Sequence, residues 1–249
     1  MDASAELTRD AVSDGALYIY QSKNGYRFGL DAVLLATDLP QLPADPVIYD
    51  LGAGHGAVGL MIANRRKDAH VTCVELQFSL FELLKKNVRE NGLEGRVHTI
   101  RDDVRNHRSG LEAHAADLVV CNPPFYRVGQ GRISPIAERA AAHQEMNGTL
   151  RDFVAAAQYV AKPGGRLKII LPPLRLADLV EAVGRTDLRG EWMRFVHGRE
   201  SEDAYLMECV FRRGGAREFH VRPPLYVHDG DAFSSEVRNR FDTAALPDS

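Results

Sequence analysis

The feature that most constrains this chain is an apolar run that stops abruptly at two prolines, within residues 117–126. The run Leu118–Cys121 is typical of a strand buried on both faces of a parallel sheet. Because Pro123 and Pro124 cannot donate hydrogen bonds to a ladder, the strand must end there and the chain must leave the sheet extended. Ligands of open α/β sheets bind at that carboxyl edge. We call residues 122–125 the finger and predict that it reaches into a ligand site.

The finger has the chemistry to hold a flat group that bears an amino nitrogen. The Asn122 side-chain oxygen and the Pro123 carbonyl can accept hydrogen bonds, and Phe125 or Tyr126 can present a ring. An isolated Asn-Pro-Pro could equally be a strand end followed by an ordinary turn. The sequence upstream decides in favour of a site.

A glycine-rich turn follows an earlier strand, at residues 47–51. The turn Gly52–Gly56 leads into a helical stretch, and its glycines allow a tight bend and close approach of a ligand to the backbone. The next strand, residues 71–74, ends in Glu75, about 20 residues beyond the glycines, where an acid can hold ribose hydroxyls. A third strand, residues 97–100, runs to Asp102-Asp103-Val104, so acids end two successive strands beside the turn. This arrangement predicts a nucleoside pocket.

Two cofactors suit such a pocket, a nicotinamide dinucleotide or S-adenosylmethionine. A dinucleotide site aims a helix amino terminus at a pyrophosphate. Here Asp50 stands just before the glycines, where its carboxylate would repel a pyrophosphate but suit the ammonium group of a methionine moiety. The residues therefore favour S-adenosylmethionine.

The alternation of strands and helices predicts an α/β fold, a doubly wound, mostly parallel, seven-stranded Rossmann-like sheet with a final antiparallel strand pair. That pair is expected at residues 191–196 and 204–211. We predict three parts: residues 1–46 as an extension that covers the cofactor pocket, residues 47–236 as the core, and residues 237–249 as a frayed tail.

Composition excludes several classes of protein. The formal net charge is −3, so any contact with a polyanion must use local patches. Three separated cysteines in apolar runs favour a reduced cytoplasmic protein, and no pattern predicts a metal site. No run approaches the roughly 20 apolar residues of a membrane span. Composition leaves the oligomeric state open, monomer or homodimer.

Two motifs together carry a family resemblance. Asp50–Gly54 followed by Asn122–Phe125 resembles the class I S-adenosylmethionine-dependent methyltransferases that modify exocyclic or amide nitrogens. Residues 25–36 and 223–228 are similar to the bacterial tRNA1(Val) adenine-37 N6-methyltransferase family. The sequence departs from the family at residues 139–145. The last three residues of this segment are His-Gln-Glu, whereas relatives tend to have Arg-His-Glu there.

The resemblance implies N6-methylation of an adenosine in tRNA, at anticodon-loop position 37, with S-adenosylmethionine as cofactor. It implies catalytic roles for Asn122, Pro123, Pro124, Phe125 and Tyr126, whose aromatic rings would stack on a base splayed from an RNA loop. It implies that the cofactor is held by Arg27, Phe28, Asp31, Asp50, Gly52, Ala53, Gly54, Glu75, Leu76, Asp102, Asp103, Val104 and Asn122. Asp103 or Asp102 would contact the cofactor adenine. Asp31 could instead simply cap the helix that begins beside it.

Contact with RNA must come from local charge. One group of arginines follows the finger, and a second group stands near the carboxyl end with Glu218 as its only acid. Such arginines are more often a solvated surface, but two groups on a mildly acidic protein leave a phosphate-tracking patch open, and we predict that removing the second group weakens RNA binding. The groups are Arg127, Arg132 and Arg139, then Arg212, Arg213, Arg217 and Arg222.

Three other functions stay open. The same finger serves glutamine N5-methyltransferases acting on release factors, although those carry a longer amino-terminal domain than the 46 residues here. A guanine N2-methyltransferase acting on ribosomal RNA is chemically close. A cofactor-binding RNA-interaction module with little turnover is a third possibility, but a mere binding module has no need of the finger.

Overall fold

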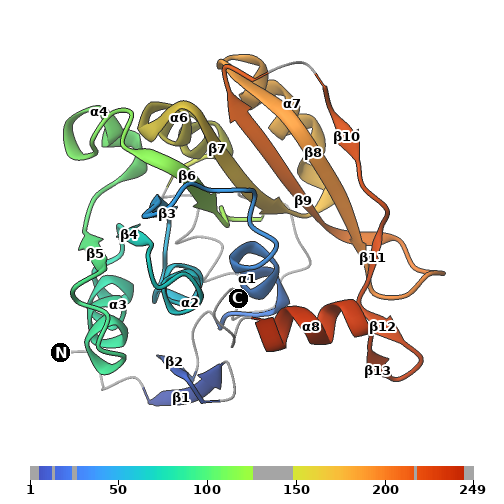
Figure 1. Ribbon diagram of the computed structural model, residues 1–249, viewed down its shortest axis with the longest axis horizontal. Helices are drawn as coiled ribbons and strands as arrows, with labels where there is room; N and C mark the ends of the chain where they lie inside the picture. The colour runs from blue at the N-terminus through green and yellow to red at the C-terminus, as the bar shows by residue number, and fades with distance from the viewer. Residues whose placement is uncertain (1–5, 13–14, 24–26, 126–147, 216–217, 244–249) are drawn as a thin grey trace.

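A single large sheet organises the protein. The computed structural model describes residues 6–12, 15–23, 27–125, 148–215 and 218–243 (Figure 1). The sheet has nine strands in the order β10-β8-β9-β7-β6-β3-β4-β5, with β11 also paired to β8. These strands are β3 (Val47–Leu51), β4 (His70–Val74), β5 (Val97–Ile100), β6 (Ala116–Cys121), β7 (Ala161–Leu171), β8 (Leu188–His197), β9 (Ala204–Arg213), β10 (His220–Val221) and β11 (Leu225–Tyr226).

The strand order reverses between β3 and β6, which are neighbours and parallel. From β3 the sheet grows through β4 to β5 on one side, and from β6 it grows to β7 on the other. A crevice at the carboxyl ends forms where the order reverses in this way. The glycine turn follows β3 and the finger follows β6, so the topology brings both to this crevice.

The predicted fold class is confirmed, including the antiparallel pair. β8 and β9 run antiparallel, and β9 also pairs antiparallel with β7. The seven predicted strands correspond to β3 through β9. Sequence patterns did not predict β10 and β11, which are two residues long each and pair parallel with β8. Runs this short carry no readable period-2 pattern, and their pairing depends on the neighbouring strand.

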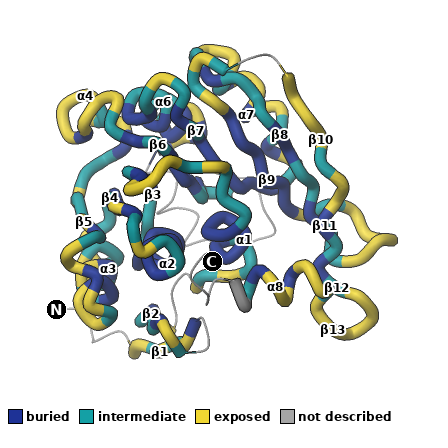
Figure 2. The backbone as a smooth tube through the Cα atoms, in the orientation of Figure 1, coloured by how far each residue is buried: buried dark blue, intermediate teal, exposed yellow. Residues whose placement is uncertain are grey.

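Helices cover both faces of the sheet. They are α1 (Leu30–Ala36), α2 (Ala57–Arg65), α3 (Phe78–Glu90), α4 (His107–Gly110), α6 (Leu150–Val160), α7 (Leu176–Gly184) and α8 (Ser235–Thr243), with 3-10 turns η1 (Val104–Asn106) and η2 (Pro173–Arg175). Helices α1, α2 and α3 bury their apolar sides in one core, and α6 and α7 bury theirs in the other. Figure 2 shows the central strands buried between these layers.

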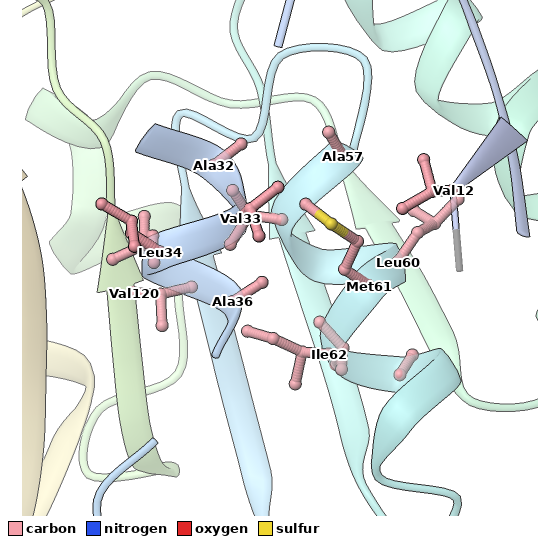
Figure 3. Packing of buried hydrophobic residues seen from close by; sticks show 14 of the residues in the cluster. Val12, Ala32, Val33, Leu34, Ala36, Ala57, Leu60, Met61, Ile62 and Val120 are labelled. Carbon is pink, nitrogen blue, oxygen red and sulfur yellow. The ribbon is translucent and has the colours of Figure 1, made fainter. Parts of the chain in front are cut away.

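Helices α1 and α2 pack against each other through buried apolar side chains. Figure 3 shows Val33 and Ala36 of α1 facing Met61 and Ile62 of α2, and all four are almost fully buried. Close packing of this kind is sensitive to changes of a single methylene. It places the start of α1 beside the carboxyl edge of the sheet.

The amino-terminal hairpin lies apart from the sheet. β1 (Leu7–Val12) pairs antiparallel with β2 (Leu17–Ser22). Two asparagines, Asn87 in α3 and Asn91 at its C-cap, bond the backbone of β2 in place of a neighbouring strand. Asn91 bonds both the N–H and the carbonyl of Tyr18, and Asn87 does the same for Tyr20. The hairpin is thereby fixed against α3.

The carboxyl-terminal prediction needs a correction. We expected residues 237–249 to fray, but the described part of that range is helical, as the end of α8. Val237 is fully buried, and Arg240 is buried against Glu208 and Asp38, at 3.3 and 3.4 Å. The polar sequence of this helix gave no sign that an ion-pair network would hold it in the core. In Figure 1 the red α8 lies beside the blue α1.

Candidate active site

The finger leaves the end of β6 with its amide oriented by α1. Asn122 Nδ2 donates to Asp31 Oδ2 at 2.7 Å, and Gly29 N donates to Asp31 Oδ1 at 3.2 Å. Asp31 therefore accepts a hydrogen bond at the start of α1, as the capping interpretation expected, and it also reaches the finger, which the sequence did not suggest. Its predicted role toward the cofactor stays a prediction. With Nδ2 committed to a carboxylate, the Asn122 side-chain oxygen is turned to the other side.

The glycine turn is held by backbone N–H donors. Gly52 N and Ala53 N both donate to Val74 O at 2.9 Å, and Gly54 N donates to Glu75 Oε2 at 2.9 Å. Glu75 Oε1 accepts from Gln77 N at 2.7 Å. Burial raises the pKa of Glu75, which is 5% exposed. The acid predicted to hold a ribose thus also ties the turn to the end of β4.

The three glycines of the turn face different surroundings. A Cβ at Gly52 would lie 2.9 Å from a Phe153 ring carbon, and one at Gly56 would lie 2.5 Å from Leu84 Cδ1. A Cβ at Gly54 would meet nothing within 4 Å. All three have positive φ, at +73, +58 and +92° for Gly52, Gly54 and Gly56. Gly52 and Gly56 are needed for packing, whereas Gly54 borders open space beside Glu75.

Asp50 lies beneath the turn. Its Oδ2 accepts from Gly59 N in α2 at 2.9 Å, and its side chain is almost fully buried. Burial raises the pKa of Asp50 to about 7, with the nearby Glu75 adding to the shift. The structure gives Asp50 a contact that anchors the first turn of α2. Its predicted role toward a methionine ammonium group stays a prediction.

The acids after β5 take separate positions. Asp103 accepts from Arg105 N at 2.9 Å and caps η1, and hydrogen bonds from Arg105 lower its pKa. Asp102 Oδ1 accepts from Asp103 N at 2.7 Å, and its other oxygen lies over Gly110, where a Cβ would be 1.5 Å away. Val104 is buried, and the Leu76 carbonyl accepts from Arg101 Nε at 3.4 Å. Which acid faces a cofactor adenine stays a prediction.

Two other predicted residues lie on the amino-terminal side. The Arg27 guanidinium bonds Asp10 and Thr8 of β1, at 3.0 and 2.8 Å. Phe28 lies edge-on to His55 of the glycine turn, with ring centroids 6.2 Å apart. Burial lowers the pKa of His55 to about 4. Of the amino-terminal trio, Asp31 reaches the finger, Phe28 reaches the turn and Arg27 secures the hairpin.

Comparison with known proteins agrees with this geometry. A family model described as "Methyltransferase small domain" matches residues 27–174, more than half of the chain. The chain belongs to the methyltransferase small-domain family. Two relatives, from Dyadobacter fermentans and Aeromonas salmonicida, are named tRNA1(Val) (adenine(37)-N6)-methyltransferase. They are 25% and 26% identical, and the matches cover 78% and 79% of this chain and 79% and 81% of theirs.

A solved structure extends the likeness to three dimensions. A predicted O-methyltransferase from Agrobacterium tumefaciens superposes with a TM-score of 0.72 at 25% identity. The superposition covers 87% of this chain and 97% of that one. Its name gives oxygen as the acceptor, whereas the curated relatives are named for nitrogen. The chain is a methyltransferase, and the acceptor atom has to be argued from the site.

Sequence reasoning missed two residues at this methyltransferase site. Arg175, from η2, donates through Nη1 to the carbonyls of Pro124 and Phe125, at 3.2 and 3.3 Å. Tyr205 is the second residue of β9, at the same edge, and is 44% exposed; burial and then the Asp31 charge raise its pKa. A prediction of pairing between β7 and β9 could have placed Tyr205 at this edge. No local signal pointed to Arg175.

The predicted arginine patch is only partly supported. Arg213 is paired with Asp187 at 3.3 Å, and Arg222 is paired with Asp38 at 3.0 Å and lies over Trp192. The end of β9 also lies at the opposite edge of the sheet from the finger. Further predicted residues fall outside the described ones: Tyr126, Arg127, Arg132, Arg139, the departing segment 139–145, and Arg217.

The described residues hold neither a membrane-spanning helix nor a cluster of metal ligands. Within them, no helix has the length and apolarity to cross a bilayer. The same residues hold no group of three or more histidine, cysteine or acidic side chains placed to bind a metal ion.

Proposed function

We propose that the protein transfers a methyl group from S-adenosylmethionine to the exocyclic N6 of an adenosine in tRNA, at anticodon-loop position 37. The observation that carries the proposal is the Asn122 amide at the end of β6, oriented by Asp31. The names of the curated relatives support the substrate. The acceptor nitrogen is supported by the chemistry of the finger.

The glycine turn fits the proposed cofactor. The open space at Gly54 lies next to the Glu75 carboxylate, which suits ribose hydroxyls. Gly52, Ala53 and Leu76 would line the same crevice, and an acid after β5 would take the adenine. When bound, S-adenosylmethionine supplies a methyl group attached to a positively charged sulfur, and that sulfur is a good leaving group. These residues would bind and orient the cofactor, whereas the groups that act on the substrate are at the finger.

The finger would activate a poor nucleophile. The lone pair of an adenine amino group is delocalised into the ring. The Asn122 side-chain oxygen and the Pro123 carbonyl can each accept one of its N–H groups, which would localise the lone pair on nitrogen and fix its direction. Catalysis is then orientation and placement of dipoles, with no covalent intermediate on the enzyme. Asp31 holds the Asn122 amide in the orientation that this requires.

The finger also bears on the alternatives. A hydroxyl acceptor has one proton to lose and needs a base, whereas two fixed acceptors match the two N–H groups of an amino group. Guanine N2 and a glutamine carboxamide present the same planar NH₂. They are therefore the competing acceptors, and an experiment must separate them.

The test is methyl transfer from labelled S-adenosylmethionine to unmodified tRNA, followed by nucleoside analysis. We expect N6-methyladenosine, and we expect Asn122→Ala to lower the rate by roughly 10²–10³-fold, the usual cost of removing one preorganised electrostatic partner. Asn239→Ala, at an exposed position of α8, is the matched control and should retain full activity. Label that appears only in ribosomal RNA or in a release factor would overturn the substrate. Full activity of Asn122→Ala would overturn the mechanism.

A further inference from the structure

The finger cannot hold itself in place with its own donors. Neither Pro123 nor Pro124 has a backbone N–H, so along these two residues the backbone offers only carbonyl oxygens. Carbonyls at a partly buried position need donors from elsewhere. Whatever supplies those donors determines where the catalytic Asn122 and the Pro123 carbonyl point.

Arg175 supplies them. Its Nη1 donates to the carbonyls of Pro124 and Phe125, at 3.2 and 3.3 Å, and its Nε donates to Asp178 Oδ2 at 2.7 Å. The residue is 6% exposed, so its charge is withdrawn from water and depends on these partners. A planar guanidinium presents several donors in fixed directions, which suits two successive carbonyls.

Arg175 stands at a position where an arginine is unfavourable for helix α7 itself. It is the N-cap residue of α7, at the positive end of the helix dipole, where a cation is disfavoured. Asp178, in the first turn, offsets that cost. Locally unfavourable choices of this kind concentrate at functional sites. The contact with the finger explains why an arginine stands here.

We infer that Arg175 is a positioning residue that sets the geometry of the finger for methyl transfer. The inference rests on the proposed function. Asp31 holds the finger through the Asn122 side chain from the α1 side of the sheet, and Arg175 holds its backbone from the α7 side. The two contacts fix a segment that bears the acceptors for the target amino group.

The test combines kinetics with a measurement that needs no turnover. The variants are Arg175→Gln and Arg175→Lys, with Arg185→Gln, an exposed arginine that follows α7, as the control. We expect Arg175→Gln to lower kcat about 10–100-fold, because misplacement by about 1 Å costs rates of this order. We expect its affinity for S-adenosylhomocysteine to stay within about twofold. Arg175→Lys keeps a donor and should recover part of kcat.

Hydrogen–deuterium exchange then reports on the finger through the Asn122 and Phe125 amides, since its two prolines carry no N–H. In Arg175→Gln, exchange in a peptide that spans residues 116–125 should become faster, while the peptide that carries the glycine turn stays as in the parent protein. Unchanged exchange in the finger peptide of folded Arg175→Gln, or unchanged kcat, would overturn the role of Arg175. Absence of methyl transfer by the parent protein would overturn the proposed function instead. Asp178→Asn leaves the carbonyl contacts in place and should change kcat less than Arg175→Gln; an equal or larger loss would assign the effect to the ion pair.

Discussion

The two loops at the carboxyl edge are held in opposite ways. The glycine turn after β3 donates its backbone N–H groups to neighbours from β4, namely Val74 O and the Glu75 carboxylate. The finger after β6 has two prolines, and its contacts come from Asp31 and Arg175, 91 residues before Asn122 and 51 residues after Pro124. One loop is secured by the adjacent strand, and the other by distant elements.

The difference matches the role that we propose for each loop. A loop that binds a cofactor must be rigid, and hydrogen bonds donated by its own backbone N–H groups make it rigid without long side chains. A loop that must present oxygens to a substrate keeps its carbonyls and gives up its donors, so outside groups must hold it. We expect substitutions at the glycine turn to affect stability and cofactor binding, and substitutions of the distant contacts to the finger to affect kcat.

The largest expected effect tests the acid beneath the glycine turn. The pKa of Asp50 is about 7 in the folded protein against an ordinary 3.8, so the folded state binds this proton more tightly than the unfolded state does. Its contribution to stability is therefore most favourable below pH 4 and is lost as pH rises through 7. Asp50→Asn should equal the parent at pH 4 and exceed it at pH 8, by up to about 4 kcal/mol for a shift of this size.

Urea unfolding of both proteins from pH 4 to 8 measures this difference. His55→Gln should show the opposite sign, because the folded pKa of His55 is about 4 against an ordinary 6.5. The contribution of His55 is present above pH 6.5 and is lost as pH falls through 4. A difference between Asp50→Asn and the parent that does not change with pH would contradict burial of a titrating carboxylate.

The next effect separates two glycines of the same turn. Gly56→Ala places a Cβ 2.5 Å from Leu84 Cδ1 at a φ of +92°, and should lower the free energy of unfolding by about 3 kcal/mol from strain and overpacking. Gly54→Ala has open space at a φ of +58° and should cost about 1 kcal/mol. Its main effect should be weaker binding of S-adenosylhomocysteine, measured by calorimetry. Equal stability losses with unchanged binding would show that Gly54 does not border the cofactor.

The smallest effect tests the finger from the α1 side. Asp31→Ala removes the hydrogen bond to Asn122 Nδ2 and should lower kcat about 10-fold, the cost of one charge-assisted hydrogen bond at the low end of its range. Affinity for S-adenosylhomocysteine should not change. Asp31→Asn keeps an acceptor and is the matched control, with a smaller loss expected. Loss of cofactor affinity with kcat retained would show that Asp31 acts on the cofactor site and not on the finger.

Much of the site could be predicted because it follows the ends of strands. Residues 118–121 indicated a buried strand, and Pro123 and Pro124 indicated where it stops. The carboxyl ends of parallel strands meet at one edge, so Gly54, Glu75 and Asn122 were expected together. The family resemblance implied only that Asp31 lies at the cofactor pocket, and its contact with Asn122 came from the structure.

What could not be predicted depends on elements far apart in the chain. Arg175 reaches the active edge because β7 runs parallel to β6 and ends there, and Tyr205 reaches it because β9 runs antiparallel to β7. No local pattern indicates the pairing of β9 or the contact of Arg175 with the finger. The same holds for α8. Its polar sequence is typical of a frayed tail, and only the folded structure shows that Arg240 pairs with Glu208 and Asp38. The arginines near the carboxyl end looked like a free patch, yet Arg213 and Arg222 pair with acids.

The sequence by itself determined the strands β3 to β9, the two loops and the chemical groups that they carry, because periodicity, proline and glycine act on neighbouring residues. Only the tertiary structure decided what holds the finger and which charges are paired. The contacts that hold the finger join residues 50 or more positions apart, and the ion pairs of Arg213, Arg222 and Arg240 join different elements of the fold. Asn122 was visible as a candidate in the sequence. The orientation of its amide depends on an aspartate that only folding brings within 2.7 Å.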